Sequence, residues 1–283
     1  MWLNYYKYKE DDSLYYSVDM LTLDFEYNNS LYDFLQSYLY SVNLPFDVDY
    51  FCCLKSYCYK HLFKFTFYSD DIFNNKSVLI IKLDFNNNKI GQIEFNPNKV
   101  LLFNPYFFDF YRLFILRVFN LEFRRSDFAV DIPLARNLVV LQRDSKKYTR
   151  IEYAGAITEY LGQRNKHGQV KLYDKGKESQ LPHELTRYEV TYEKNNILNL
   201  PKIYIKEDID VVDDISSKDK MIISLLLNSE QPFNFLKQLK NYNTRKRLTL
   251  LLQEHLKLIE INQQLFFDLL IDYQKELFFA LDT

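Results

Sequence analysis

The stretch GQVKLYDKGKE, residues 168–178, is the part of the chain from which fold and function are best argued. Residues 169–174 predict a short β-strand, and alternate side chains of a strand share one face. We therefore expect Lys171, Tyr173 and Lys175 to point the same way. Two nearby ammonium groups favour a phenolate and attract anions, which makes Tyr173 a candidate nucleophile toward a phosphate. Taken alone, the stretch is more typical of a basic edge strand with a solvated tyrosine.

Length and composition bound the class of protein. The 283 residues, 47% of them hydrophobic, are enough for one large or two modest folded domains. No apolar run is long enough to span a bilayer, and the first residues lack the pattern of a signal peptide. Three cysteines, two of them adjacent, do not form a disulfide framework. We expect a cytoplasmic protein without a membrane partner.

The charge is close to balanced overall but unevenly distributed. The net charge is −2, which argues against a surface that coats nucleic acid throughout. Residues 164–177 hold five Lys or Arg and one acid, and residues 237–257 hold six and one. Residues 207–219 hold six acids and one Lys. Local basic patches beside an acidic connector can still bind a polyanion.

Periodicity predicts an α+β fold, with a largely antiparallel sheet and helices on one face over residues 1–200. The predicted strands are 14–25, 59–68, 77–85, 89–95, 125–132, 152–160, 169–174 and 187–193. Helices are expected after Ser30 as N-cap and from Asn104-Pro105 through Phe119. Residues 201–219 read as an acidic connector, and 220–283 as a fully helical C-terminal region. The sequence shows no internal repeat.

Carboxylates alternate along two of these strands. Asp127 and Asp131 share a face of RSDFAVD (125–131), and Glu189 follows Arg187 in RYEVT (187–191). Glu94 occupies a similar place in IEFN (93–96). If these strands neighbour Tyr173, their oxygens would suit Mg²⁺ or Mn²⁺ rather than zinc. A polar sheet face with ordinary Arg–carboxylate pairs explains the same spacing.

Other chemistries are disfavoured. No two of the four histidines are spaced as His-x-His. Cys52, Cys53, Cys58 and His61 lack the paired C-x₂-C spacing of a zinc site. The chain has neither a GxxxxGK[ST] nor a GxGxxG motif, which argues against an ATPase or a dinucleotide enzyme.

Five motifs in order resemble one family. They are IEFNPNK (93–99), RSDFAVD (125–131), EYLGQR…GQVKLYDKGKE (159–178), TRYEVTYEK (186–194) and MIISLLLN (221–228). Their order and spacing, over roughly residues 14–250, are similar to the replication initiation factor (Rep_trans) family of rolling-circle plasmids, whose relatives include phage initiators and some conjugative relaxases.

The resemblance implies a site-specific DNA nickase. Leu172-Tyr173-Asp174-Lys175 matches the family's catalytic motif, so Tyr173 would form a 5′-phosphotyrosine intermediate. The acidic metal site would map onto Asp127, Asp131 and Glu189, with Glu94 a weaker candidate. Arg164, Lys175 and Arg187 match basic positions expected to face the scissile phosphate, and Lys171 would contact the DNA.

The resemblance also implies partners. Origin recognition would use the segment Asn241, Tyr242, Asn243, Arg245, Lys246 and Arg247, although relatives can carry lysines where this chain has Asn241 and Asn243. The family acts as homodimers on duplex and single-stranded origin DNA, with a host helicase and polymerase. Two alternatives stay open: a relaxase for conjugative transfer, and a non-catalytic origin-binding protein.

Overall fold

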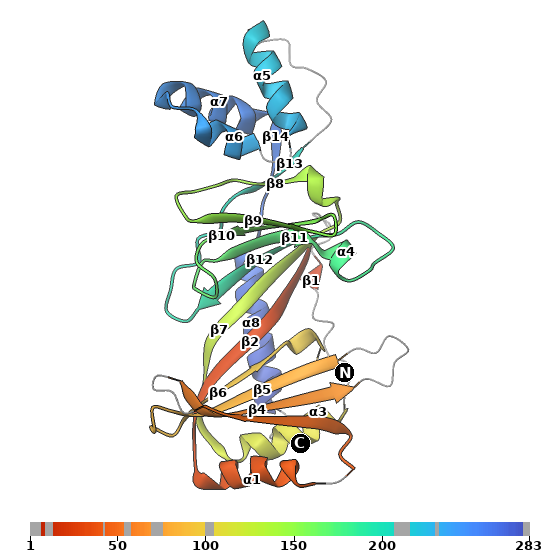
Figure 1. Ribbon diagram of the computed structural model, residues 1–283, viewed down its shortest axis with the longest axis vertical. Coiled ribbons are helices and arrows are strands. Elements are labelled where there is room, and N and C mark those ends of the chain that lie inside the picture. Colours follow the sequence, from red (N-terminus) through yellow and green to blue (C-terminus); the bar gives the residue numbers. More distant parts are fainter. Residues whose placement is uncertain are drawn as a thin grey trace.

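The structure is a computed structural model that describes residues 7–8, 14–41, 43–53, 58–68, 76–99, 105–206, 216–229 and 232–279. Its main feature is an eleven-stranded antiparallel sheet in which helices cover one face (Figure 1). The predicted α+β class is therefore confirmed. The predicted cap Asn104 and the acidic residues 207–215 lie outside the described residues.

The large sheet runs in the order β3-β4-β5-β6-β2-β7-β12-β11-β10-β9, and β1 pairs with β2. Its strands are β1 (Lys7–Tyr8), β2 (Tyr15–Tyr27), β3 (Phe46–Cys52), β4 (Tyr59–Tyr68), β5 (Lys76–Phe85), β6 (Ile90–Phe95), β7 (Val118–Ile132), β9 (Tyr148–Tyr153), β10 (Ala156–Leu161), β11 (Val170–Asp174) and β12 (Thr186–Glu193).

The backbone repeats a topology that the sequence does not reveal. We call β2–β6 the N-terminal half, and β7 with β9–β12 the C-terminal half. In each half the first strand pairs with the last strand, and the second strand forms the outer edge. The two first strands, β2 and β7, pair antiparallel along most of their length and form the seam between the halves. The long strands of this seam join the two halves in Figure 1.

One hydrophobic core lies behind the sheet and spans both halves. Helices α1 (Asn29–Leu39) and α3 (Pro105–Ile115) cover the N-terminal half, where Phe65 and Phe110 have ring centroids 4.3 Å apart. Helix α8 (Gln263–Phe279) crosses behind β2 and β7. Its Phe266 ring lies 4.8 Å from that of Phe128. Burial of such aromatic side chains contributes about 1.5–3 kcal/mol each. Charged side chains gather on the opposite face of the sheet.

A second, smaller core lies at one end of the molecule. It joins a three-stranded sheet to three helices, which we call the helical unit (Figure 1). The strands are β8 (Val139–Leu141), β13 (Ile203–Lys206) and β14 (Leu256–Ile259), and the helices are α5 (Ser217–Asn228), α6 (Pro232–Gln238) and α7 (Tyr242–Glu254). No helix among the described residues has the length and apolarity needed to cross a bilayer.

Several predicted boundaries differ from the structure. The helix expected through Phe119 ends at Ile115, because Val118 already begins the long seam strand β7. Asn28, not Ser30, caps α1, and its side chain accepts a hydrogen bond from Leu31 N at 3.2 Å. Residues 203–206 are a strand rather than connector, and 256–259 are a strand rather than helix, because these two segments pair with each other.

The single strand predicted at 152–160 is in fact a hairpin of β9 and β10. It turns at Ala154 and Gly155, which both have positive φ. Helix α8 packs on the large sheet, so the region from residue 220 onward is not one helical body.

Candidate active site

The polar face of the sheet carries the Tyr173 side chain. In β11, Val170 and Leu172 are buried in the core, which leaves Lys171 and Tyr173 on the opposite face, as predicted. Antiparallel pairing places Lys171 opposite Glu189, and Tyr173 opposite Arg187, on β12. The strand therefore delivers a phenol and an ammonium group to a row of charged side chains.

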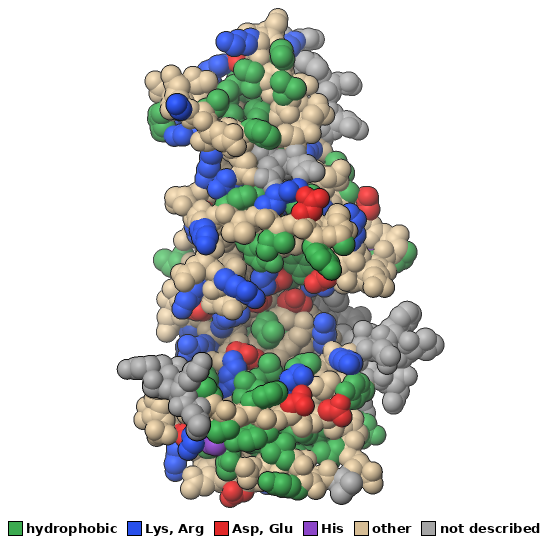
Figure 2. Space-filling model, in the orientation of Figure 1, with side chains coloured by type: hydrophobic (Ala, Val, Ile, Leu, Met, Phe, Trp, Pro, Cys, Tyr) green, Lys and Arg blue, Asp and Glu red, His purple; other side chains and the backbone are tan. Residues whose placement is uncertain are grey.

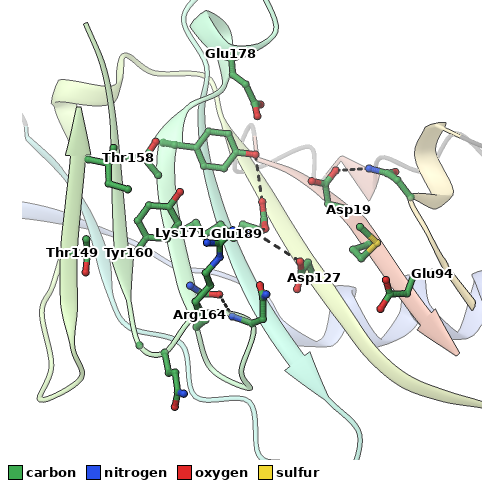
Figure 3. A pocket seen from close by; sticks show the side chains of 18 of the residues that line it. Asp19, Glu94, Asp127, Thr149, Thr158, Tyr160, Arg164, Lys171, Glu178 and Glu189 are labelled. Carbon is green, nitrogen blue, oxygen red and sulfur yellow. Dashed lines mark hydrogen bonds and ion pairs between the residues drawn. The ribbon is translucent and has the colours of Figure 1, made fainter. Parts of the chain in front are cut away.

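Glu189 connects Tyr173 with Lys171. Tyr173 Oη donates a hydrogen bond to Glu189 Oε2 at 3.4 Å, and Lys171 Nζ donates to Glu189 Oε1 (Figure 3). Lys171 Nζ also lies 3.9 Å from Asp127 Oδ2 on β7. Because Lys171 holds one carboxylate oxygen of Glu189, the other oxygen stays directed at the phenol.

The protonation states in this cluster follow from burial. Burial raises the pKa of Glu189, and Lys171 opposes the shift only in part. Burial acts to lower the pKa of Lys171, but Glu189 and Asp127 outweigh it, so that its pKa is raised. The pKa of Tyr173 is raised by burial first and by Glu189 second. Arg187 favours the phenolate, as expected of a cation, but burial and Glu189 outweigh it, so the net pKa shift is opposite to the expected one.

Lys175 follows the end of β11, so strand alternation does not place its side chain as the prediction assumed. Asp174 caps the short helix α4 (Lys175–Glu178), and its Oδ1 accepts a hydrogen bond from Lys177 N at 2.9 Å. Lys175 Nζ donates to Glu178 Oε2 at 2.5 Å. It also lies 5.9 Å from the Tyr173 ring centroid, within the range of a cation–π contact.

A buried ion pair fixes Arg187 beside Tyr173. Arg187 donates to both oxygens of Asp131, at 2.6 and 2.7 Å, and to Asp19 Oδ1 at 3.0 Å. Asn96 Nδ2 also donates to Asp19 Oδ1, at 3.0 Å. Asp131 therefore serves as a bidentate partner of the guanidinium. For this residue, the alternative of an ordinary Arg–carboxylate pair describes the structure. Arg187 is held where its charge acts on the neighbouring phenol.

Three of the four carboxylates predicted as metal ligands are already held by a cationic side chain. Among the described residues, no three His, Cys, Asp or Glu side chains converge on one point. Glu94 is held by Lys82 Nζ at 2.6 Å, and Asp131 by Arg187. Asp127 differs, because its Oδ1 is buried without a hydrogen-bond partner among these residues. An unpaired buried carboxylate oxygen beside Glu189 fits a hard cation, and Mg²⁺ often takes only one or two carboxylates plus phosphate oxygens.

The site opens into a groove of about 1000 Å³ on the polar face. Asp19, Asp127 and Glu189 lie at its floor, and Glu94 lies across the seam (Figure 3). Arg164, from the connection between β10 and β11, is exposed and lines the same groove, as a phosphate contact should. Lys175, Arg187 and Asp131 are not among the lining residues.

The predicted DNA-binding segment divides into two kinds of residue. Asn241 caps α7 by accepting a hydrogen bond from Thr244 N at 3.0 Å, and Arg247 forms a bidentate pair with Asp219 on α5. Asn241 therefore stabilises the start of α7, and Arg247 links α7 to α5. Four others are at least partly exposed and available to a ligand, namely Tyr242, Asn243, Arg245 and Lys246.

Sequence reasoning missed Asp19, Arg143 and Lys237. Asp19 lies in a β-bulge of β2, where the register with β7 shifts between Val18 and Met20. Such bulges redirect a side chain, and alternation alone does not locate them. Arg143 and Lys237 join Arg245 and Lys246 around a cleft of about 550 Å³ at the helical unit. The basic run 237–257 was the available signal for Lys237.

Comparisons with known proteins add little to this geometry. No protein-family model matches the chain, and no curated protein matches it in sequence. Among solved structures, a rolling circle replication initiator protein from Geobacillus stearothermophilus matches with a TM-score of 0.38 and 15% identity. The match covers 71% of this chain and 90% of that chain. A likeness of this size does not assign an activity to this chain.

Proposed function

We propose that the protein is a rolling-circle replication initiator that nicks and rejoins DNA at an origin through a 5′-phosphotyrosine on Tyr173. One observation carries the proposal: the Tyr173 hydroxyl donates to a buried carboxylate that Lys171 orients, at the floor of an open groove. A buried carboxylate with a raised pKa is a better match to neutral pH as a general base than an ordinary one.

The chemistry follows from these contacts. Tyr173 Oη attacks the phosphorus while its proton passes to Glu189 Oε2. The bond from phosphorus to O3′ breaks, which leaves a phosphotyrosine and a 3′-hydroxyl once that oxygen takes a proton from water. The fixed charge of Arg187 stabilises negative charge that develops on the phenol oxygen. Rejoining is the same exchange in reverse and needs no ATP.

Asp127 is the residue that would hold Mg²⁺ or Mn²⁺, because Lys171 and Tyr173 already occupy the two oxygens of Glu189. Such a cation would polarise a non-bridging phosphate oxygen and orient the backbone of the substrate. The unpaired Asp127 Oδ1 supports this assignment, and the locked carboxylates of Asp131 and Glu94 argue for a smaller ligand set than the sequence implied.

The helical unit would dock on duplex origin DNA. Arg143, Lys237, Arg245 and Lys246 surround one cleft, a pattern that suits phosphate contacts. A bacterial cytoplasm, a homodimer, and a host helicase and polymerase complete the proposed setting. The same chemistry would serve a relaxase, and the identity of the nicked site would separate the two roles.

The test is capture of the covalent intermediate. The protein is incubated with Mg²⁺ or Mn²⁺ and either supercoiled plasmids that carry candidate origins or single-stranded hairpins with randomised loops. We expect nicked circles and protein attached to the 5′ end, with Tyr173 as the modified residue. Tyr173→Phe should abolish both products, while Tyr160→Phe, one strand away in the same groove, should keep them. Nicking by Tyr173→Phe would overturn the proposal.

A further inference from the structure

The two halves of the sheet are copies of one strand topology, and only one of them carries the proposed chemistry. In chain order, the strands of the N-terminal half (β2 to β6) correspond to β7, β9, β10, β11 and β12 of the C-terminal half. By this correspondence β5 is the counterpart of β11, and β6 is the counterpart of β12. The polar faces of both halves meet in one groove across the seam.

The N-terminal half keeps the charge pair of the site but has no nucleophile. Lys82 on β5 lies opposite Gln92 on β6, and its Nζ donates to Gln92 Oε1 at 3.1 Å. The counterpart in the other half is Lys171 opposite Glu189. Lys82 Nζ also donates to Glu94 Oε1 at 2.6 Å, so this half has a Lys–carboxylate pair. However, β5 (KSVLIIKLDF) contains no tyrosine to attack a phosphate.

The groove has an acidic floor and a basic rim, and both halves supply the rim. Lys76 and Lys99 line it from the N-terminal half, and Lys147 and Arg164 line it from the C-terminal half. All four are exposed, and the described residues offer none of them an ion pair. Ser77 Oγ donates to Lys99 O at 2.7 Å, which ties Lys99 to the start of β5 beside Lys76. Figure 2 shows the front hollowed between the halves, with Lys and Arg side chains along the hollow.

This distribution of charge favours one class of ligand. Cations on two facing rims suit an extended polyanion whose phosphates pass both walls, whereas a small anion would need only one cluster. Apolar side chains of Met20, Val78 and Ile80 line the N-terminal wall between the rims and give unpaired bases a surface to contact. A single strand can follow such a groove with its backbone near both rims.

We propose that the N-terminal half is a catalytically silent copy that forms the second wall of the substrate groove, where Lys76 and Lys99 hold phosphates of single-stranded nucleic acid flanking the reacting phosphate. The identity of the reacting phosphate rests on the proposed function. The binding surface does not, because it needs no reaction at Tyr173.

The test measures binding without cleavage. The full chain, in EDTA, is titrated with a fluorescein-labelled strand of about 16 thymidines, within the range of single-strand site sizes. Fluorescence anisotropy is recorded over a series of salt concentrations. The double variant Lys76→Ala/Lys99→Ala is compared with Lys60→Ala/Lys89→Ala, two exposed lysines of the same half that do not line the groove. A third variant, Lys147→Ala/Arg164→Ala, reports on the opposite wall.

We expect Lys76→Ala/Lys99→Ala to weaken binding about tenfold near 0.15 M salt and to reduce the salt slope by about 1.4, as loss of two single-strand phosphate contacts should. Lys147→Ala/Arg164→Ala should behave alike, and Lys60→Ala/Lys89→Ala should match the unmodified chain. The four rim side chains are exposed, so unfolding midpoints should not change.

Unchanged affinity and an unchanged salt slope in Lys76→Ala/Lys99→Ala would contradict the proposed second wall, even if Tyr173 proves to be the nucleophile. Conversely, absence of nicking with binding that depends on both walls would refute the proposed activity and leave the second wall standing.

Discussion

The groove of the large sheet and the cleft of the helical unit are both lined with cations, but they hold them differently. Lys171 lies partly buried in the groove and pairs with Glu189, and Arg187 is buried beside it and pairs with Asp131. At the helical unit Lys246 is exposed, and Arg245 stacks over the Tyr242 ring, with 5.6 Å between guanidinium carbon and ring centroid. Fixed, desolvated charge suits control of a reacting atom, and solvated charge suits reversible contact with a polyanion. Substitutions in the two regions should therefore change different quantities.

The largest effect should come from the proposed base. Glu189→Gln should lower the rate of nicking about 10²- to 10⁴-fold, as loss of a general base does. The unmodified protein needs the deprotonated carboxylate, so its rate should fall as the pH is lowered through the raised pKa of Glu189, above the ordinary value of about 4.3. Single-turnover rates across pH check both points. An acidic limb that survives in Glu189→Gln would assign the base to another group.

The second-largest effect should come from the buried ion pair between Arg187 and Asp131, beside Tyr173. Asp131→Ala leaves Arg187 with a buried, partly unpaired charge and should lower the free energy of unfolding by about 3–5 kcal/mol. Urea denaturation measures this change in the free energy of unfolding. The matched control is Asp49→Ala, which breaks an exposed pair with Lys64 and should cost about 1 kcal/mol or less. Equal losses in the two variants would show that the pair beside Tyr173 is not desolvated.

At the helical unit the change should appear in affinity. Arg245→Ala/Lys246→Ala should weaken binding to duplex origin DNA and reduce the salt slope by about 2, one unit for each phosphate contact. Anisotropy titrations with a labelled duplex at several salt concentrations measure it. Stability should change little, because Lys246 is exposed and Arg245 makes one long hydrogen bond, of 3.4 Å, to Leu239 O. An unchanged slope would place the duplex on another surface.

The smallest effect should show whether Asn241 caps a helix or contacts DNA. Asn241→Ala should lower the free energy of unfolding by about 1 kcal/mol, because its side chain caps α7. Its DNA affinity should stay close to that of the unmodified chain below the unfolding transition. Asn243→Ala is the control, because this exposed neighbour is not the cap. Thermal unfolding and anisotropy together decide the role, and a loss of affinity without a loss of stability would make Asn241 a DNA contact.

Local patterns predicted those parts of the fold that depend on near neighbours. The strand 59–68 and the hairpin around Asn86–Asn88 agree with the structure, because alternation and turn residues are properties of the segments themselves. The apolar run after Pro105 fits helix or strand equally well. Pairing with β2 decides that its last part is β7. In the same way, pairing with β13 makes Leu256–Ile259 a strand.

The candidate site was predictable where neighbouring strands carry alternating charges. The structure brings Tyr173, Lys171, Asp127 and Glu189 together, because each lies on the polar face of a strand that the sequence predicts. Asp19 was not, because a bulge sets its direction. The expected direction of the pKa shift of Tyr173 was wrong, because the sequence shows neighbouring charges but not how deeply a side chain is buried.

The ladder between β2 and β7 has a mechanical consequence. It runs from Tyr15 to Tyr27 on one strand and from Asp131 to Val118 on the other, with α8 packed across its back. The two walls of the groove therefore belong to one continuous hydrogen-bonded sheet. Separating them would require breaking the backbone hydrogen bonds at the centre of the fold. A strand that lies in the groove thus meets both walls on one surface, and it can reach them from the open side.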